Sequence, residues 1–238
     1  MTIKPRLNAF FIHLSISLLL AAILLTIVLL QWYPNGMIYA GGLEGLKLIV
    51  GVDLVLGPVL TFIVFDLAKP ELKRDITLIG CLQLSCMGFG TWIVYTERPV
   101  AQVLMGDGVH LISLAESQDY DLKLSSYPGK NVKRIIMNLP ENPKDWKTAQ
   151  SLSEFVDAIP YLFRSDLYIG LDKVDEDVYK KRISQIKEFH SDELQVELAP
   201  MGGINGCDWI PLRSKHFKGL ACFSKKNGVQ KLNNTRLL

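Results

Sequence analysis

Apolar residues gather in three long runs within the first hundred positions of this 238-residue chain. The runs lie at residues 9–30, 46–65 and 76–95, and few charged residues interrupt them. A helix rises about 1.5 Å per residue, so about 20 apolar residues cross a hydrocarbon layer of roughly 30 Å. The pattern predicts a membrane α-helical domain with three transmembrane helices over residues 1–96.

From residue 97 onward the apolar runs become short and are separated by turn residues. The segments "VAQVLM" and "VHLISL" flank Gly-Asp-Gly, and "KGLACFS" and "VQKL" flank a turn that ends in Asn-Gly, so both pairs predict β-hairpins. Further strands are expected at 132–139, 194–200 and 208–214, and helices at 145–159 and 175–190. Residues 97–238 are therefore predicted to form one mixed α+β domain.

Basic residues in the short flanks predict the orientation of the helices, because cytoplasmic loops of membrane proteins are enriched in Lys and Arg. The flank before the first run and the loop after the second carry Lys4, Arg6, Lys69, Lys73 and Arg74. The loop at 31–45 carries no basic residue. We therefore expect a multi-pass protein of the bacterial inner membrane, with a cytoplasmic N-terminus and a periplasmic domain at 97–238.

Charge and motif content argue against several classes of function. The formal net charge of +2 is spread without a long basic run, so nothing indicates a nucleic acid partner. The sequence shows no G-x-S-x-G, no P-loop, no G-x-G-x-x-G after a strand and no H-E-x-x-H, and its histidines are scattered. We predict no catalytic residue, no cofactor and no metal site, and a protein that is not an enzyme.

The four cysteines fall into two pairs with different surroundings. Cys81 and Cys86 lie in the third apolar run, five residues apart and on different helix faces, and are expected to act as small packing residues. Cys207 and Cys222 lie in the exported part, where an oxidising compartment allows a disulfide. A metal or redox role for them is disfavoured because the sequence has no C-x-x-C and no His/Cys cluster. We predict a structural Cys207–Cys222 bond.

One acid and one proline interrupt the second apolar run, in the stretch "GVDLVLGPVL". Counted from the end of the run, Asp53 lies about two helical turns from the outer side, roughly 10 Å deep. Residues four apart share a helix face, so Asp53, Gly57 and Thr61 form a stripe of a carboxyl, a gap and a hydroxyl. Pro58 cannot donate a hydrogen bond to the carbonyl of Leu54, which predicts a kink beside the gap.

Three roles are open to this stripe. Asp53 could hydrogen-bond another span of the same chain, for example at Thr91 or Thr26, because intramembrane acids usually face a bundle interior. The stripe could instead form a groove for the helix of a partner, or Asp53 could carry a transported proton. The proton path is disfavoured because no His, Glu or Lys is expected at the same depth, and His13 is placed nearer the cytoplasmic face.

The motifs "HLSISLLL", "WYP", "GVDLVLGPVLTFIVFDLAK", "LKRD" and "GTWIVYTERPV" together resemble those of the type IV pilin accessory proteins of the TfpX/TfpZ type, also called FimB-like. The resemblance covers the first hundred residues, and the remainder is similar only in outline. It implies a non-enzymatic inner-membrane protein that aids pilin stability or pilus assembly, with a type IV pilin as partner. It implies no binding residues, so Asp53, Gly57, Pro58 and Thr61 rest on the physical argument alone.

Two other classes of function fit parts of the pattern. A membrane-anchored sensor or ligand-binding protein would account for a periplasmic α+β domain, but the cytoplasmic side offers only a short tail and one short loop as an output. An exported enzyme would need a catalytic constellation that the motif search does not find. An accessory role in pilus assembly is therefore the preferred expectation.

Overall fold

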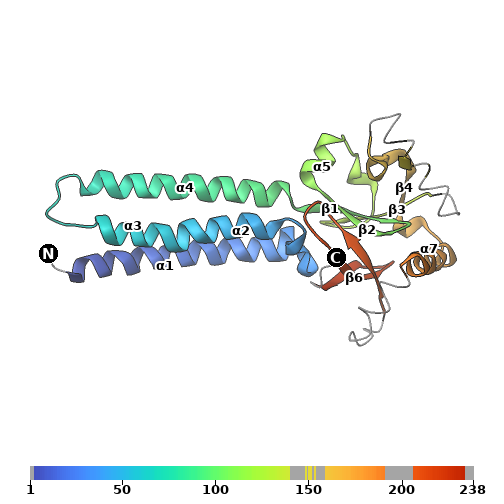
Figure 1. Cartoon of the computed structure of the whole chain (residues 1–238), viewed down its shortest axis with the longest axis horizontal. Coiled ribbons are helices and arrows are strands. Elements are labelled where there is room, and N and C mark those ends of the chain that lie inside the picture. Colours follow the sequence, from blue (N-terminus) through green and yellow to red (C-terminus); the bar gives the residue numbers. More distant parts are fainter. Residues whose placement is uncertain are drawn as a thin grey trace. The chain divides into compact units, whose positions relative to one another are not determined.

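A computed structural model of the chain describes residues 3–139, 148, 150–151, 153, 159–190 and 206–233. It divides into two compact units, one formed by Met1–Pro34 and Gly41–Glu97 and the other by Asn35–Ala40 and Arg98–Leu238. Three long apolar helices precede a mixed sheet with helices (Figure 1), which confirms the predicted fold class.

Among the residues that the structure describes, three helices are long and apolar enough to cross a membrane: Ile3–Trp32, Gly42–Val64 and Leu72–Thr96. They consist of α1 (Ile3–Ile27) with the π-helical η1 (Val28–Trp32), α2 (Gly42–Val50) with the π-helical η3 (Gly51–Leu56) and α3 (Gly57–Val64), and α4 (Leu72–Thr96). Each begins four to six residues before the predicted apolar run, because a helix continues through the glycines and charged residues that flank the run.

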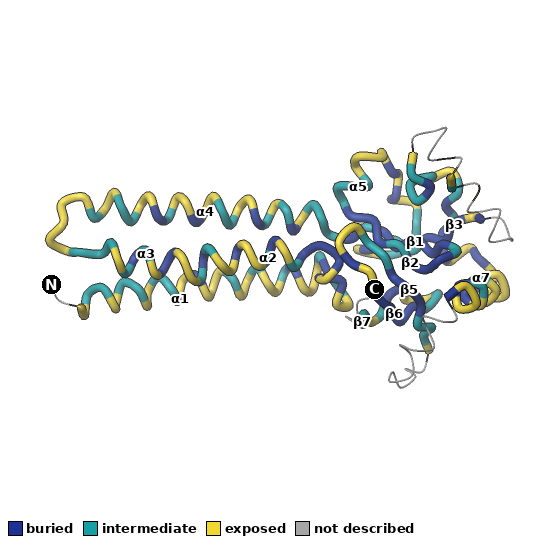
Figure 2. The backbone as a smooth tube through the Cα atoms, in the orientation of Figure 1, coloured by how far each residue is buried: buried dark blue, intermediate teal, exposed yellow. Residues whose placement is uncertain are grey.

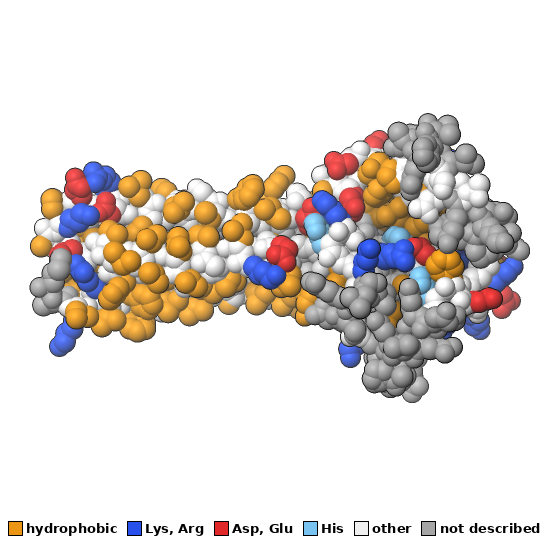
Figure 3. Space-filling model, viewed as in Figure 1, with side chains coloured by type: hydrophobic (Ala, Val, Ile, Leu, Met, Phe, Trp, Pro, Cys, Tyr) orange, Lys and Arg blue, Asp and Glu red, His pale blue; other side chains and the backbone are white. Residues whose placement is uncertain are grey.

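The outer surface of this helical unit is largely apolar. Leu19, Ile63 and Phe89 are 60–63% exposed, and apolar side chains cover most of the face seen in Figure 3. Buried residues recur along the sides of the helices that face one another (Figure 2), and they include four polar side chains: Ser17, Asp53, Thr61 and Gln83. An apolar exterior around buried polar groups suits a bundle surrounded by hydrocarbon.

We call the helix Gly42–Val64, which consists of α2, η3 and α3, the middle helix. It packs against both of the others, since α1 contacts mainly α3, and α4 contacts both α2 and α3. Two glycines bring α2 and α4 close. A Cβ at Gly45 would lie 2.5 Å from Cγ2 of Val94, and a Cβ at Gly90 would lie 2.5 Å from Cγ1 of Ile49. No side chain fits in such a space, so small residues are what allow the two helices to approach.

Within the described residues, the second unit is built on a seven-stranded sheet in the order β4-β3-β1-β2-β5-β6-β7. The strands are β1 (Pro99–Met105), β2 (Gly108–Ser113), β3 (Lys133–Met137), β4 (Tyr168–Gly170), β5 (Asp208–Arg213), β6 (Lys218–Ser224) and β7 (Gly228–Asn233). The pairs β1–β3 and β2–β5 are parallel, and the other neighbours are antiparallel. The apolar side chains of the central strands form the core, including Val103, Ile112 and Ile135, which are inaccessible to solvent.

The predicted hairpins are confirmed as β1–β2 and β6–β7, and the predicted strand at 132–139 corresponds to β3. The predicted helix at 175–190 is α7 (Glu176–Phe189), which buries Tyr179, Ile183 and Ile186. The predicted strand at 194–200 and most of the predicted helix at 145–159 lie outside the described residues. The described part of the chain also contains the short helix α5 (Leu114–Asp119) and the 3₁₀ turns η2 (Pro34–Ala40), η4 (Leu124–Ser126), η6 (Tyr161–Phe163), η7 (Ser165–Leu167) and η8 (Leu171–Lys173).

The segment Asn35–Ala40 belongs to the second unit although it precedes α2 in the sequence. The side-chain amide of Asn35 donates a hydrogen bond to the carbonyl oxygen of Val229 at 2.7 Å. The rings of Tyr39 and Phe217 lie 6.4 Å apart between their centroids. A loop that the sequence pattern assigns to the connection between two membrane helices thus packs on strands near the end of the chain.

Cys207 and Cys222 form a disulfide, with their Cα atoms 5.4 Å apart. Cys222 lies in β6 opposite Trp209 of β5, so the bond ties the start of β5 to its neighbouring strand. Cys81 and Cys86 are free thiols in α4. The structure therefore contains the pairing that the sequence predicts.

Candidate functional site

The middle helix changes its hydrogen-bonding pattern immediately before Pro58. The backbone N–H of Gly57 donates to the carbonyl oxygen of Val52, five residues earlier, as in a π-helix. This wider turn accommodates a proline whose ring nitrogen has no hydrogen to donate. The sequence predicts a kink at Pro58, and the structure has the π-helical segment η3, which contains Asp53, immediately before this proline.

Asp53 lies at the midpoint of the middle helix, eleven residues after Gly42 and eleven before Val64. Counted from the start of the apolar run, Asp53 lies nearer one end, because the helix begins four residues before that run. The Asp53 side chain is 6% exposed, and neither carboxyl oxygen has a hydrogen-bond partner among the described residues. Thr26, a predicted partner, donates instead to the carbonyl oxygen of Ala22 in its own helix.

Asp53 lines an open cavity of about 160 Å³ within the helical unit. One wall comes from α1 and the other from α4, and Ile49 and Asp53 of the middle helix form its floor. The lining residues are His13, Ile16, Ser17, Leu20 and Ala21 of α1, Ile49 and Asp53, and Gly80, Gln83, Leu84 and Met87 of α4. We call this feature the α1–α4 groove.

The other three predicted groove residues are buried inside the helical unit and do not line this cavity. A Cβ at Gly57 would lie 1.9 Å from Nε2 of Gln83, so the Gln83 side chain of α4 occupies the gap. Thr61 Oγ1 lies 2.6 Å from Nδ1 of His13 on α1. Asp53 is thus the member of the stripe that opens into the groove, and the role of all four residues in partner binding stays a prediction.

From the sequence alone, Gln83 has no predicted role, and His13 is expected near the cytoplasmic face. The structure places both beside the stripe: Gln83 Nε2 donates to the Asp53 carbonyl oxygen at 3.4 Å, and His13 shares the groove with Asp53. A signal for the α1 wall is present in the sequence, because His13, Ser17 and Ala21 are spaced by four and therefore share one helix face.

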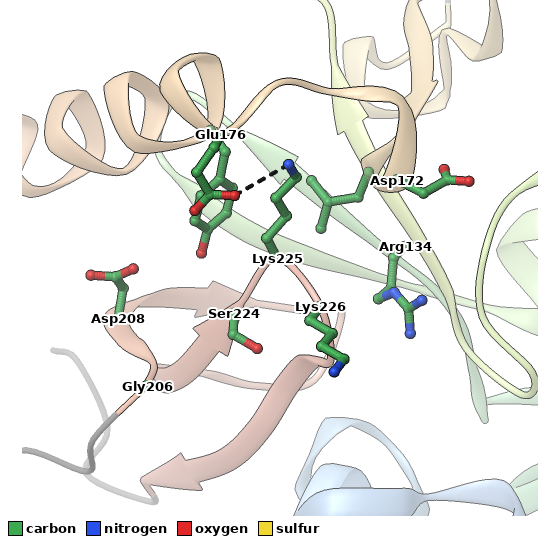
Figure 4. Close-up of a pocket in the computed structure, with 10 residues that line it drawn as sticks. Arg134, Asp172, Glu176, Gly206, Asp208, Ser224, Lys225 and Lys226 are labelled. Carbon is green, nitrogen blue, oxygen red and sulfur yellow. Dashed lines mark hydrogen bonds and ion pairs between the residues drawn. The ribbon is translucent and has the colours of Figure 1, made fainter.

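A pocket of about 560 Å³ opens on the second unit, between the start of α7 and the turn that joins β6 to β7 (Figure 4). Lys225 reaches across it and pairs with Glu176 at 3.2 Å. Its described charged lining residues are Arg134, Lys225, Lys226, Asp172, Glu176 and Asp208. Acidic and basic side chains are equal in number, so the pocket has no net charge with which to select an anion or a cation.

A cluster of charged side chains surrounds Asp107 in the turn between β1 and β2. Its carboxyl oxygens lie 2.9 Å from Nε2 of His110 and 2.6 Å from Nη1 of Arg213, and its carbonyl oxygen lies 3.0 Å from Nε2 of His190. Burial alone would raise the pKa of this carboxyl, but the hydrogen bond and charge of His110, together with the Arg213 charge, hold it below its ordinary value of 3.8. Removal of this carboxylate would leave the charge of Arg213 without its partner.

We expect Asp107→Asn to lower the free energy of unfolding at pH 7 by about 2 kcal/mol, because it leaves Arg213 without its partner. A carboxyl whose pKa is lowered by folding stabilises the folded state above its unfolded-state pKa and loses that contribution as the pH falls through the folded-state value. The difference between the wild-type chain and the variant should therefore shrink below about pH 4. Denaturant unfolding of the full chain in detergent at several pH values measures this, and a difference that stays constant down to pH 3 would contradict the assignment.

Among the described residues, no group of three or more His, Cys, Asp or Glu side chains is placed to hold a metal ion. The strongest site on geometric grounds is the α1–α4 groove, because it joins a cavity to a buried carboxyl whose two oxygens have no partner among the described residues. Its chemistry is that of a receptor for a hydrogen-bond donor.

A family model and the curated relatives that match this chain are all described as fimbrial assembly proteins. The family model described as fimbrial assembly protein FimB matches residues 1–35. The fimbrial assembly protein of serogroups C1 and C2 from Dichelobacter nodosus is 36% identical over 105 residues, which cover 43% of this chain and 80% of that relative. The serogroup I protein of the same organism is 30% identical over 158 residues, covering 61% of this chain and 58% of the relative. No solved structure matches the chain.

Proposed function

Because the chain belongs to the FimB family of fimbrial assembly proteins, we propose that it acts in the assembly of type IV pili. In this proposal it is a non-enzymatic accessory protein of the bacterial inner membrane. It binds pilin subunits in the membrane and stabilises them before they join the pilus. The aligned region covers 58% of the serogroup I relative, so the pilin partner is part of the proposal.

The observation that carries this function is the α1–α4 groove with Asp53 on its floor. A pilin that waits in the inner membrane presents a long apolar helix, and a protein that holds it needs a lateral opening between its own helices. The main contacts of α1 and α4 are with the middle helix, which leaves such an opening between them. The apolar exterior of the three helices supports their placement in the bilayer.

The basic flanks support an N-terminus in the cytoplasm and a second unit in the periplasm, where the Cys207–Cys222 disulfide would form and persist. A reporter enzyme that is active only in the periplasm should be active when fused after Leu238. The same reporter inserted between Lys69 and Arg74 should be inactive. The reverse pattern of activities would show that the orientation is wrong.

The function is tested by deleting this chain in its own bacterium and counting surface pili by electron microscopy. We expect most pili to disappear and the amount of pilin in the inner membrane to fall, and we expect the full chain supplied from a plasmid to restore both. Unchanged pili and unchanged pilin in the deletion strain would refute the proposal.

A further inference from the structure

We propose that the α1–α4 groove receives one membrane-spanning helix that inserts a single uncharged hydrogen-bond donor, such as a hydroxyl or an amide, toward Asp53. The inference rests on the proposed function only for the identity of this helix, which would be that of the pilin. It adds the chemistry by which the helix is recognised and the depth at which recognition takes place.

The need for a donor follows from Asp53 itself. Its side chain is 94% buried, and neither of its carboxyl oxygens accepts a hydrogen bond from a described residue. Leaving a buried carboxyl without a donor is costly, and the cost is greater away from water. The neighbouring polar groups are satisfied differently, because Thr61 pairs with His13 and Gln83 donates to the Asp53 carbonyl. The unsatisfied oxygens therefore mark the point where a ligand completes the site.

The volume of the groove admits one side chain of the incoming helix, and the backbone of that helix lies across the opening. Its volume of about 160 Å³ is roughly five times the ~30 Å³ that one water molecule occupies in the liquid. Both walls carry small residues, Ser17 and Ala21 on α1 and Gly80 on α4, which allows the backbone of another helix to approach closely. A Cβ at Gly80 would meet nothing within 4 Å, and Leu84 beside it is 62% exposed. A helix can thus lie across the opening and extend one side chain inward.

The depth and the lining favour an uncharged donor. Asp53 lies at the middle of its helix, where a charged group on the incoming helix would be most costly to bury. Apart from Asp53, His13 is the titratable side chain in the described lining, and its Nδ1 faces the hydroxyl of Thr61. Lipid acyl chains carry no hydrogen-bond donor, and headgroups lie far from this depth, so lipid cannot satisfy the carboxyl.

The test places a photo-crosslinking amino acid at Leu84 of the full chain in living cells and maps the crosslinked segment by mass spectrometry. We expect crosslinks to the membrane helix of the pilin, next to a Ser, Thr, Asn or Gln. Asp53→Leu removes the acceptor and should lower the yield at least about tenfold. Asp53→Asn keeps one acceptor oxygen and should retain the yield within about threefold.

A second pair of variants tests the groove without changing Asp53. Gly80→Leu should fill the cavity and lower the yield as strongly as Asp53→Leu, whereas Gly88→Leu on the same helix should not. A Cβ at either glycine meets nothing within 4 Å, so both variants should fold, and levels are matched by immunoblot. The control differs in that Gly88 does not line the cavity.

Crosslinks to lipid alone, to a second copy of this chain, or to a helix at the same yield in Asp53→Leu would overturn the inference, as would an Asp53→Asn variant that fails like Asp53→Leu. The two proposals fail separately. If pili are lost on deletion but the crosslink yield is the same in Asp53→Leu as in the wild-type chain, the assembly function stands without this groove chemistry. If an Asp53-dependent helix is captured but deletion leaves piliation unchanged, the groove stands and its partner is not the pilin.

Discussion

Replacing Cys207 and Cys222 with alanine is expected to lower the free energy of unfolding of the second unit by roughly 3 kcal/mol. The bond closes a loop of 15 residues, and the unfolded chain gains the conformational entropy that this closure removes. Each single replacement should cost about as much as the double one, because either breaks the same bond. Denaturant unfolding of the full chain in detergent measures the loss.

The matched control is Cys81→Ala, since Cys81 is a free and exposed thiol that should contribute little. Alkylation of the unfolded chain without reductant should label the two free cysteines of α4, and alkylation after reduction should label all four. Four labelled thiols without reductant, in protein taken from intact cells, would show that the bond does not form there.

Gly90→Leu is expected to destabilise the helical unit by roughly 3 kcal/mol and to reduce the amount of folded protein several-fold. A Cβ at this position would lie 2.5 Å from Cγ1 of Ile49, an inner atom of a side chain that is 2% exposed. Neither the backbone of α4 nor Ile49 can give way without separating α2 from α4. The amount of protein in the membrane fraction and its resistance to detergent unfolding measure the effect.

Gly88→Leu is the control for this prediction, because a Cβ there meets nothing within 4 Å and the same residue is added to the same helix. Equal amounts of folded protein in the two variants would mean that α2 and α4 do not pack through Gly45 and Gly90.

The sequence pattern predicts individual elements well and their assembly poorly. Apolar runs predict the three long helices, and Gly-Asp-Gly and Asn-Gly predict both hairpins, because these signals act over a few residues. The parallel pairing of β2 with β5 joins strands about a hundred residues apart in sequence, and no local sequence signal predicts it. The same holds for Asn35, whose partner Val229 lies near the other end of the chain.

In the candidate site, likewise, the sequence predicts the residue of interest but not its neighbours in space. Asp53 stands out in the sequence as an acid within an apolar run, but its neighbours depend on how the helices are rotated about their axes. The spacing of His13, Ser17 and Ala21 marks one face of α1, but it does not show which residues of the other helices this face meets. The contacts of His13 with Thr61 and of Gln83 with Gly57 therefore become visible only in the structure. They leave Asp53, and not the whole predicted stripe, open to the groove.

In the proposed function, this chain physically holds pilin in the inner membrane. The most direct measurement is chemical crosslinking in intact piliated cells, followed by isolation of this chain and quantification of the pilin attached to it. We expect pilin to be the main crosslinked protein, and we expect Asp53→Leu, at matched levels, to capture much less of it than Gly88→Leu. Wild-type protein that carries no pilin while the cells are assembling pili would show that the chain does not hold pilin.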